Sequence, residues 1–254
     1  MNILVLIKQT FDTEEKIILQ NGKVCEDGVN FIINPYDEYA IEEAIKLREL
    51  HGGEVTVITI GPERSENALR TALAMGTDKA IIIDSEDQEL DEYSIAKVLE
   101  AVIKGRKFDL ILGGNMAVDN GSGQVGPRLA EELDIPQITN ATYIEINGNQ
   151  VIIERDVEGD IELVESTLPI LATAQQGLNE PRYPSLPGIL KAKKKPIERL
   201  RIDELDLEDC INAKTVVTET YFPPKKNAGR ILVGEIKDQV SELANLLRNK
   251  AKVL

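Results

Sequence analysis

The chain has 254 residues, and its 44 acidic and 29 basic residues give a formal net charge of −15 at pH 7. This length and a hydrophobic content of 42% suffice for a large folded core, while the charge and the absence of Trp disfavour nucleic-acid binding. No apolar run approaches the roughly 18 to 20 residues of a membrane span, and the N-terminal segment lacks the features of a secretion signal. We therefore expect a cytoplasmic protein that neither spans a membrane nor binds nucleic acid.

Four short apolar runs, each bounded by polar residues, are typical of buried parallel strands. They span residues 2–8, 55–60, 80–84 and 110–113. Segments with helical periodicity separate them, at residues 38–50, 63–75 and 92–104. This alternation predicts an α/β fold, a Rossmann-like domain in which helices flank a parallel sheet. Ligands of such a fold bind at the carboxyl ends of the strands, near a change in strand order.

Hairpins are expected as additions to this core, because Asn-Gly pairs favour the positive φ angles of tight turns. One hairpin is predicted over residues 17–33, around Asn21-Gly22. Another is predicted over residues 142–153, around Asn147-Gly148, and residues 158–160 would form the turn of a third hairpin.

The composition changes in the C-terminal quarter of the chain. Four prolines from Pro181 to Pro196 exclude a long helix or strand there. Residues 1–200 are expected to form the nucleotide-binding α/β domain, and residues 201–254 an extended arm that ends in an amphipathic helix over 235–252. Because the arm has no core of its own, we expect it to pack on a partner subunit; packing on its own chain is the alternative.

The most informative segment runs from Leu112 to Leu129, where small residues lead from a predicted strand into a predicted helix. Gly121 and Gly123 allow a close backbone approach, and the free N–H groups at the start of the helix can hold a phosphate. Ser122 would cap the helix or donate to a phosphate oxygen. The segment matches neither the Walker pattern nor GxGxxG, and an ordinary strand-to-helix turn is the alternative.

Other strand ends should reach the same edge of the sheet. Asp37 is predicted to be the N-cap of the helix that begins near residue 38, and Asn34 could bond an adenine edge or a ribose. Lys8 could face an anion or remain solvated. The residues expected to bind the nucleotide are Leu6, Lys8, Asn34, Pro35, Tyr36, Asp37, Ile60, Gly61, Gly114, Asn115, Met116, Ala117, Val118, Asp119, Asn120, Gly121, Ser122, Gly123, Gln124 and Val125.

No catalytic residue and no metal site is expected. The single histidine, His51, cannot complete a Ser-His-Asp or Cys-His arrangement, and Cys25 and Cys210 lie far apart in the sequence. The carboxylate pairs Glu42-Glu43 and Glu131-Glu132 are expected on solvated helix surfaces. The chain thus supplies binding groups, and any redox chemistry must come from a cofactor.

Four motifs together are typical of one family. They are Asn34-Pro35-Tyr36-Asp37 with Glu42-Glu43-Ala44, residues 70–76, the loop Ala117-x-Asp119-x-x-x-x-Gln124-x-Gly126, and Leu178 to Pro187 followed by Lys191-Ala192-Lys193-Lys194-Lys195. In these motifs, and from end to end, the sequence resembles the beta (small) subunits of electron transfer flavoproteins. The resemblance implies a heterodimer with a larger, FAD-carrying alpha subunit that passes electrons between a flavin-dependent dehydrogenase and an acceptor.

The resemblance also bears on the cofactor of this subunit. Family members hold either AMP or a second FAD in the beta-subunit crevice, and those with FAD bifurcate electrons from NADH to an acceptor such as ferredoxin. The ending Gln124-Val125-Gly126-Pro127, with small residues before it, resembles the bifurcating group and implies FAD. Residues 120–123 depart from the Asp-Gly-Asp-Thr-Ala type of that group, and AMP is the alternative.

By the same resemblance, residues 178–196 form a loop that recognises a dehydrogenase of the acyl-CoA type. Leu186 would be its apolar anchor, with Tyr183, Lys191 and Lys193 beside it. A packed connector is the alternative.

Two other classes of protein share parts of the pattern. A nucleotide sensor of the universal-stress type would have this sheet but would normally end near residue 150. An ATP-pyrophosphatase would have Ser-Gly-Gly-x-Asp-Ser after its first strand, where this chain has residues 8–12, Lys-Gln-Thr-Phe-Asp.

Overall fold

The computed structural model describes residues 1–85, 88–205, 207, 211–226 and 228–254, so Cys210 lies outside the described residues. The strands of the main sheet are β1 (Asn2–Leu6), β6 (Glu54–Gly61), β7 (Lys79–Asp84), β8 (Leu110–Gly114), β9 (Gln137–Asn147), β10 (Gln150–Val157), β11 (Asp160–Thr167), β12 (Ile170–Ala174) and β13 (Glu198–Arg201). Within the described part of the chain they form a nine-stranded sheet in the order β11-β10-β9-β12-β8-β1-β6-β7-β13.

In the order of the sheet, the seven strands from β9 at one side to β13 at the other edge pair in parallel. Beyond β9, the strands β10 and β11 extend the sheet in antiparallel pairing. From β1 the chain proceeds outward to β6 and β7, and it then returns to β8 on the other side of β1. The strand order therefore changes between β1 and β8, as expected for an α/β fold with its ligand site at that point.

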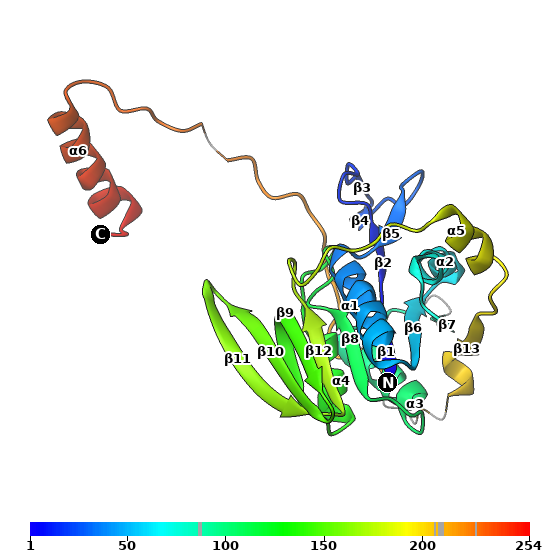
Figure 1. Cartoon of the computed structure of the whole chain (residues 1–254). Helices are drawn as coiled ribbons and strands as arrows, with labels where there is room; N and C mark the ends of the chain where they lie inside the picture. The colour runs from blue at the N-terminus through cyan, green and yellow to red at the C-terminus, as the bar shows by residue number, and fades with distance from the viewer. Residues whose placement is uncertain (86–87, 206, 208–210, 227) are drawn as a thin grey trace.

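Helices cover both faces of the sheet (Figure 1). They are α1 (Pro35–His51), α2 (Glu66–Met75), which follows the short 3-10 turn η1 (Glu63–Ser65), α3 (Glu92–Ile103) and α4 (Val125–Glu132). The apolar residues of α1 and α2 share one buried cluster with the sheet, and those of α3 and α4 share another. The predicted mixed α/β architecture is thereby confirmed; β12 and β13 were not predicted.

The first and third predicted turns are confirmed and the second is shifted by one residue, while the pairing of the first hairpin differs from the prediction. Asn21 and Gly22 have positive φ angles and join β3 (Leu19–Gln20) to β4 (Lys23–Val24). These two strands pair with each other over two residues each. The rest of the segment returns through β5 (Phe31–Ile33), which pairs with β2 (Gln9–Phe11). The next turn lies at residues 148–149, one position later than predicted, because Asn147 pairs with Gln150. The third predicted turn joins β10 to β11 at residues 158–159.

The C-terminal part remains on the body of the molecule beyond the predicted boundary at residue 200. Strand β13 adds to β7 at the sheet edge, and the buried Ile202 of η2 (Ile202–Glu204) joins the cluster beneath α3. Asp91 then accepts hydrogen bonds from the backbone N–H groups of Lys214 and Thr215. The arm therefore departs after Thr215 rather than at residue 201.

Beyond that point the chain runs away from the body to α6 (Ile236–Asn245), which continues into the π-helix η4 (Leu246–Ala251) and stands apart from the sheet (Figure 1). This confirms the predicted C-terminal helix. In the described residues, no helix combines the length and the apolar character needed to cross a lipid bilayer.

Candidate functional site

A crevice of about 150 Å³ opens at the carboxyl ends of β1 and β8, where the strand order changes. Most of the predicted binding residues line it. They are Leu6, Lys8, Asn34, Asp37, Ile60, Gly114, Asn115, Met116, Ala117, Asn120, Ser122, Gly123, Gln124 and Val125. These segments are distant in the sequence, and they meet because parallel strands have their carboxyl ends at the same edge of the sheet.

The remaining predicted residues flank the crevice along the chain without lining it. They are Pro35, Tyr36, Gly61, Val118, Asp119 and Gly121. Sequence reasoning missed the opposite wall, where Glu92, Ile95 and Leu99 of α3 face the loop. Their spacing of three and four places them on one helix face, and that spacing is the signal that could have identified them.

Asp37 joins the two strands that diverge at the crevice. The helix α1 begins at Pro35 with Asn34 as its N-cap residue, so the prediction that Asp37 is the N-cap was wrong. The carboxylate of Asp37 instead accepts hydrogen bonds from the backbone N–H groups of Lys8 at 2.7 Å and Gly114 at 2.9 Å. Burial raises the pKa of Asp37 to about 7, although these hydrogen bonds favour the charged form.

Gly114 permits the close approach of β8 to the first turn of α1. A Cβ atom on Gly114 would lie 2.3 Å from Oδ1 of Asp37 and 2.7 Å from Cβ of Tyr36. A side chain at this position would therefore force the strand and the helix apart.

Asn34 holds the beginning of the glycine-rich loop. Its Nδ2 atom donates to the carbonyl of Met116 at 2.9 Å and to Oδ1 of Asp37 at 2.9 Å. Its Oδ1 atom accepts the N–H of Val118 at 3.1 Å, and the side chain is buried. Because its polar atoms are bonded within the chain, Asn34 shapes the crevice; a bond from Asn34 to a nucleotide stays a prediction.

The backbone of the loop leaves donors available at the crevice. Gly121 and Gly123 have φ angles of +63° and +60°, in the left-handed region that favours glycine. Among the described residues, no group accepts a hydrogen bond from the N–H of Gly123 or Gln124. Of the two predicted roles of Ser122, that of the helix cap was wrong, because α4 begins at Val125 with Gln124 as its N-cap residue; donation to a phosphate oxygen stays a prediction.

Two polar contacts connect the loop to the other side of the crevice mouth. Lys8 forms an ion pair with Asp119, with Nζ 2.6 Å from Oδ2. Asn120 donates to Oε1 of Glu92 on α3 at 3.3 Å. These contacts hold the loop against β1 and α3.

A second predicted region, residues 178–196, is called the docking segment below. Its short helix α5 (Leu186–Ala192) begins at the cap residue Ser185. Tyr183 is 95% exposed and Leu186 is 79% exposed, and Lys191 and Lys193 also face solvent. The residues predicted to meet a partner are therefore accessible.

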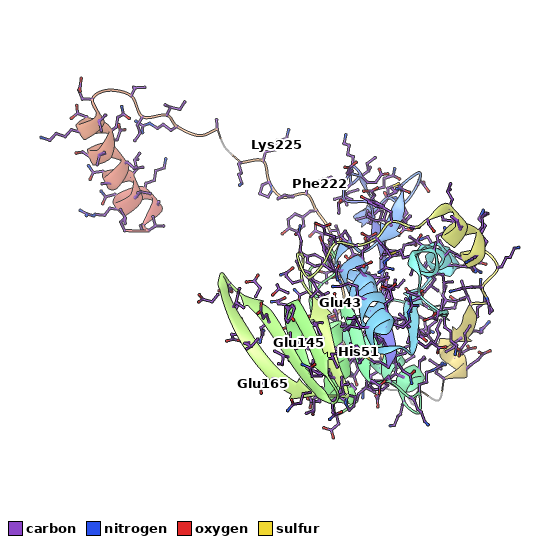
Figure 2. All side chains as sticks on the ribbon, viewed as in Figure 1. Glu43, His51, Glu145, Glu165, Phe222 and Lys225 are labelled. Atoms are coloured by element: carbon purple, nitrogen blue, oxygen red, sulfur yellow. The ribbon has the colours of Figure 1, made fainter. Side chains whose placement is uncertain are left out.

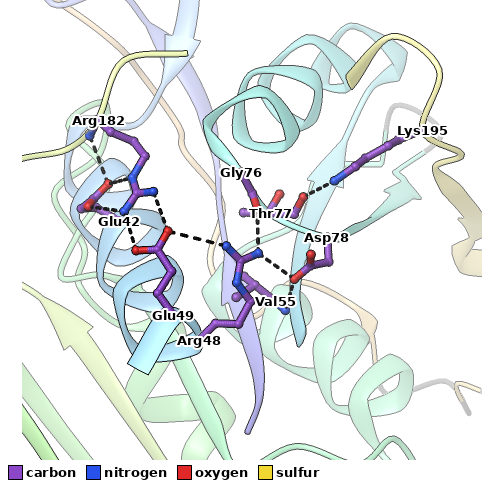
Figure 3. A network of polar contacts seen from close by, with 9 residues as sticks. All are labelled: Glu42, Arg48, Glu49, Val55, Gly76, Thr77, Asp78, Arg182 and Lys195. Atoms are coloured by element: carbon purple, nitrogen blue, oxygen red, sulfur yellow. Dashed lines mark hydrogen bonds and ion pairs between the residues drawn. The ribbon is translucent and has the colours of Figure 1, made fainter. Parts of the chain in front are cut away.

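The prediction that Glu42-Glu43 forms a solvated surface was wrong. Both side chains are buried, because the docking segment crosses α1 and covers them. Glu42 accepts hydrogen bonds from Arg182 (Figure 3), and Glu43 accepts one from Asn179 at 3.0 Å. Of the other predicted pair, Glu131 is exposed and Glu132 is half-buried beside Lys97.

The sequence matches one family of known proteins, and the relatives found carry the same description. The family model of the electron transfer flavoprotein domain matches residues 21–205. The chain is 60% identical to electron transfer flavoprotein subunit beta of Bacillus subtilis, with 100% of both chains covered. It is 43% identical to the protein of the same description from Thermoanaerobacterium thermosaccharolyticum, covering 98% of this chain and 99% of that one. The human subunit beta is 35% identical, with 98% of each chain covered.

Proposed function

The chain belongs to the electron transfer flavoprotein family as a beta subunit, and on this premise we propose that it pairs with an alpha subunit to carry electrons from a flavin-dependent dehydrogenase. In this proposal the crevice holds the adenine-nucleotide part of a cofactor. The docking segment meets the dehydrogenase, and the arm binds the alpha subunit.

The observation that carries the nucleotide proposal is the backbone of residues 121–124. Two left-handed glycines lie at the carboxyl edge of a parallel sheet, beside the N-terminus of α4, and the N–H groups of Gly123 and Gln124 there have no acceptor in the described part of the chain. N–H groups in this arrangement favour a phosphate through local dipoles, so the binding of an anion is compatible with a net charge of −15. The residues present therefore fit an adenine nucleotide.

For the cofactor we propose FAD, with AMP as the alternative. The inner part of the crevice is apolar, with Leu6, Ile58 and Ile60 from the strands and Ile95 and Leu99 from α3. Such walls can receive a flat ring while the loop holds the phosphate. A bound flavin would supply one- and two-electron chemistry. In the proposed bifurcating complex, NADH would be the electron donor and ferredoxin an acceptor.

Substitution of Gly123 by Val tests the phosphate position. A β-branched residue is strained at φ +60°, and its Cβ atom would lie 3.4 Å from the carbonyl of Asn115. We expect the purified heterodimer to lose most of its beta-subunit nucleotide. Gly148→Val is a matched control, because Gly148 has φ +64° with no atom near its Cβ position and lies in the β9–β10 turn. Full nucleotide content in Gly123→Val would contradict the assignment.

The identity of the nucleotide is tested by counting cofactors per heterodimer. Two flavins per pair, with direct reduction by NADH, would support FAD in this subunit. One flavin and one AMP per pair would contradict the FAD proposal while supporting the crevice as an adenine-nucleotide site.

A further inference from the structure

We propose that Arg182 and Lys195 are positioning residues that hold the two ends of the docking segment on one polar network, so that Leu186 is presented in a fixed place. This inference rests on the docking role proposed above. It assigns a function to side chains that do not themselves meet the dehydrogenase.

The first end of the docking segment is held at Arg182. Its Nε and Nη2 atoms donate to the carboxylate of Glu42 at 2.8 and 3.0 Å, and its backbone N–H donates to the same carboxylate at 3.1 Å. Its Nη1 atom donates to Glu49 at 2.8 Å. Because Glu42 is 5% exposed, its charge is removed from water and depends on Arg182 for a partner.

The network continues from Glu49 across α1 to the turn between α2 and β7 (Figure 3). Arg48 forms an ion pair with Glu49 at 3.9 Å. It also donates to the carbonyl of Gly76 at 2.8 Å and to Asp78 at 2.9 Å. Asp78 in turn accepts the N–H of Val55 at the start of β6.

The other end of the docking segment returns to the same turn. Nζ of Lys195 donates to the carbonyl of Thr77 at 2.6 Å, between the two residues that Arg48 contacts (Figure 3). Arg70 of α2 donates to the carbonyls of Ala192 and Lys195 at 2.7 and 2.6 Å. Lys195 thus differs from Lys191 and Lys193, which face solvent.

Between its two ends the segment packs closely on α2. A Cβ atom on Gly188 would lie 2.5 Å from the carbonyl of Ala74, so α5 approaches α2 as only glycine allows. Leu186 and Leu190 nevertheless remain 79% and 66% exposed. The backbone is therefore fixed while its apolar side chains stay free, which lowers the entropy that docking would otherwise cost.

The test uses the purified heterodimer with its nucleotides and a flavin-dependent dehydrogenase of the same organism that reduces it. In Arg182→Gln we expect the KM for the heterodimer to rise about tenfold with kcat unchanged, and amide exchange at residues 183–190 to accelerate. Arg182→Lys, which keeps one charged donor, should recover part of the KM. Lys195→Met should give a smaller rise, because Arg70 still holds that end.

A matched control is Arg106→Gln. The side chains of Arg106 and Arg182 are both 36% exposed, and Arg106 pairs with Glu198 away from the docking segment. This variant should leave KM unchanged. An equal rise in the control would overturn the inference, since the effect would then follow from any loss of a surface ion pair.

A double-mutant comparison separates this inference from the docking proposal. If Arg182 acts through Leu186, then Arg182→Gln in a Leu186→Ala background should raise KM no further. Additive effects would overturn the positioning role. A Leu186→Ala variant with normal KM would instead contradict the docking proposal itself.

Should Arg182→Gln fail to fold, the comparison is made with Glu49→Gln. This substitution removes only the outer carboxylate and leaves Glu42 paired with Arg182. An unchanged KM and an unchanged exchange rate in Glu49→Gln would also overturn the inference.

Discussion

Two regions of the molecule expose apolar side chains, and they do so in opposite ways. In the docking segment, Tyr183 and Leu186 stand on a backbone that is held by the ion pair of Arg182 with the buried Glu42 and by packing on α2. In the arm, Phe222 is exposed on a chain that has left the body (Figure 2), and Val240 of α6 is exposed as well. We expect the first surface to be formed before any partner binds, and the second to acquire its contacts from the proposed alpha subunit. Exposure alone therefore does not distinguish a preformed docking surface from a segment that is ordered on binding.

Removal of the arm should have the largest effect. Deleting residues 230–254 removes α6 and its exposed apolar stripe, whose burial contributes on the order of several kcal/mol at ~25 cal/mol per Å². We expect the heterodimer to be lost while the α/β body keeps its melting temperature, because α6 stands apart from the sheet. Size-exclusion chromatography with the alpha subunit measures this. An undiminished heterodimer would contradict the assignment of the arm.

A pH test examines the stability of the body on which the docking segment is held. Asp37 lies on α1, the helix that also carries Glu42. The pKa of Asp37 rises from 3.8 in the unfolded chain to about 7 in the folded protein. At pH values between these two, the folded protein therefore keeps a proton on Asp37 that the unfolded chain has released. The free energy of unfolding should therefore fall as pH rises from 5 to 8, by roughly 1 to 3 kcal/mol. Urea unfolding should show a smaller fall in Asp37→Asn. The same pH profile in both proteins would refute this role of Asp37.

The root of the arm can be loosened without damaging the body. Oδ1 of Asp91 accepts the N–H of Ser94 at the start of α3, and Oδ2 accepts the N–H groups of Lys214 and Thr215 at 2.6 and 2.9 Å. An Asn side chain can still cap α3, but it would then turn its NH₂ group toward the two arm donors. We expect Asp91→Asn to weaken heterodimer formation by about 1 to 2 kcal/mol, with little change in melting temperature.

Asp109→Asn is the control for that prediction, because Asp109 also accepts a backbone N–H, from Asn2, but lies away from the arm. Titration of each variant with the alpha subunit provides the measurement. Equal weakening by both substitutions would argue against a specific role for the arm root.

The smallest effect on the molecule itself is expected at Leu186. Since this side chain is 79% exposed, Leu186→Ala should leave the melting temperature and flavin content unchanged. It should weaken transfer to the dehydrogenase by about 1 to 3 kcal/mol. A fall in melting temperature would instead assign Leu186 to the packed core.

The parts of the fold that the sequence predicted are those with a local signal. Buried apolar runs identified β1, β6, β7 and β8, and the rule for parallel strands placed their ends at one crevice. The strand β13, with the sequence Glu-Arg-Leu-Arg, is a charged edge strand without such a run and was missed.

The errors arose where distant segments meet. Asp37 has the local pattern of a helix cap, yet its partners are Lys8, which follows β1, and Gly114, which ends β8. The periodicity of α1 likewise could not indicate that Arg182 crosses over Glu42. Helical patterns report which side of a helix faces its own sheet, and they do not report which later segment covers the other side.

Amide hydrogen exchange of the chain alone and in the heterodimer tests the central claim most directly, namely that the docking segment is formed before binding and the arm is ordered by it. Residues 186–192 should exchange slowly in both samples, and residues 236–251 should exchange rapidly alone and slowly in the heterodimer. Slow exchange of the arm in the isolated chain, or protection of the docking segment only in the heterodimer, would contradict the account.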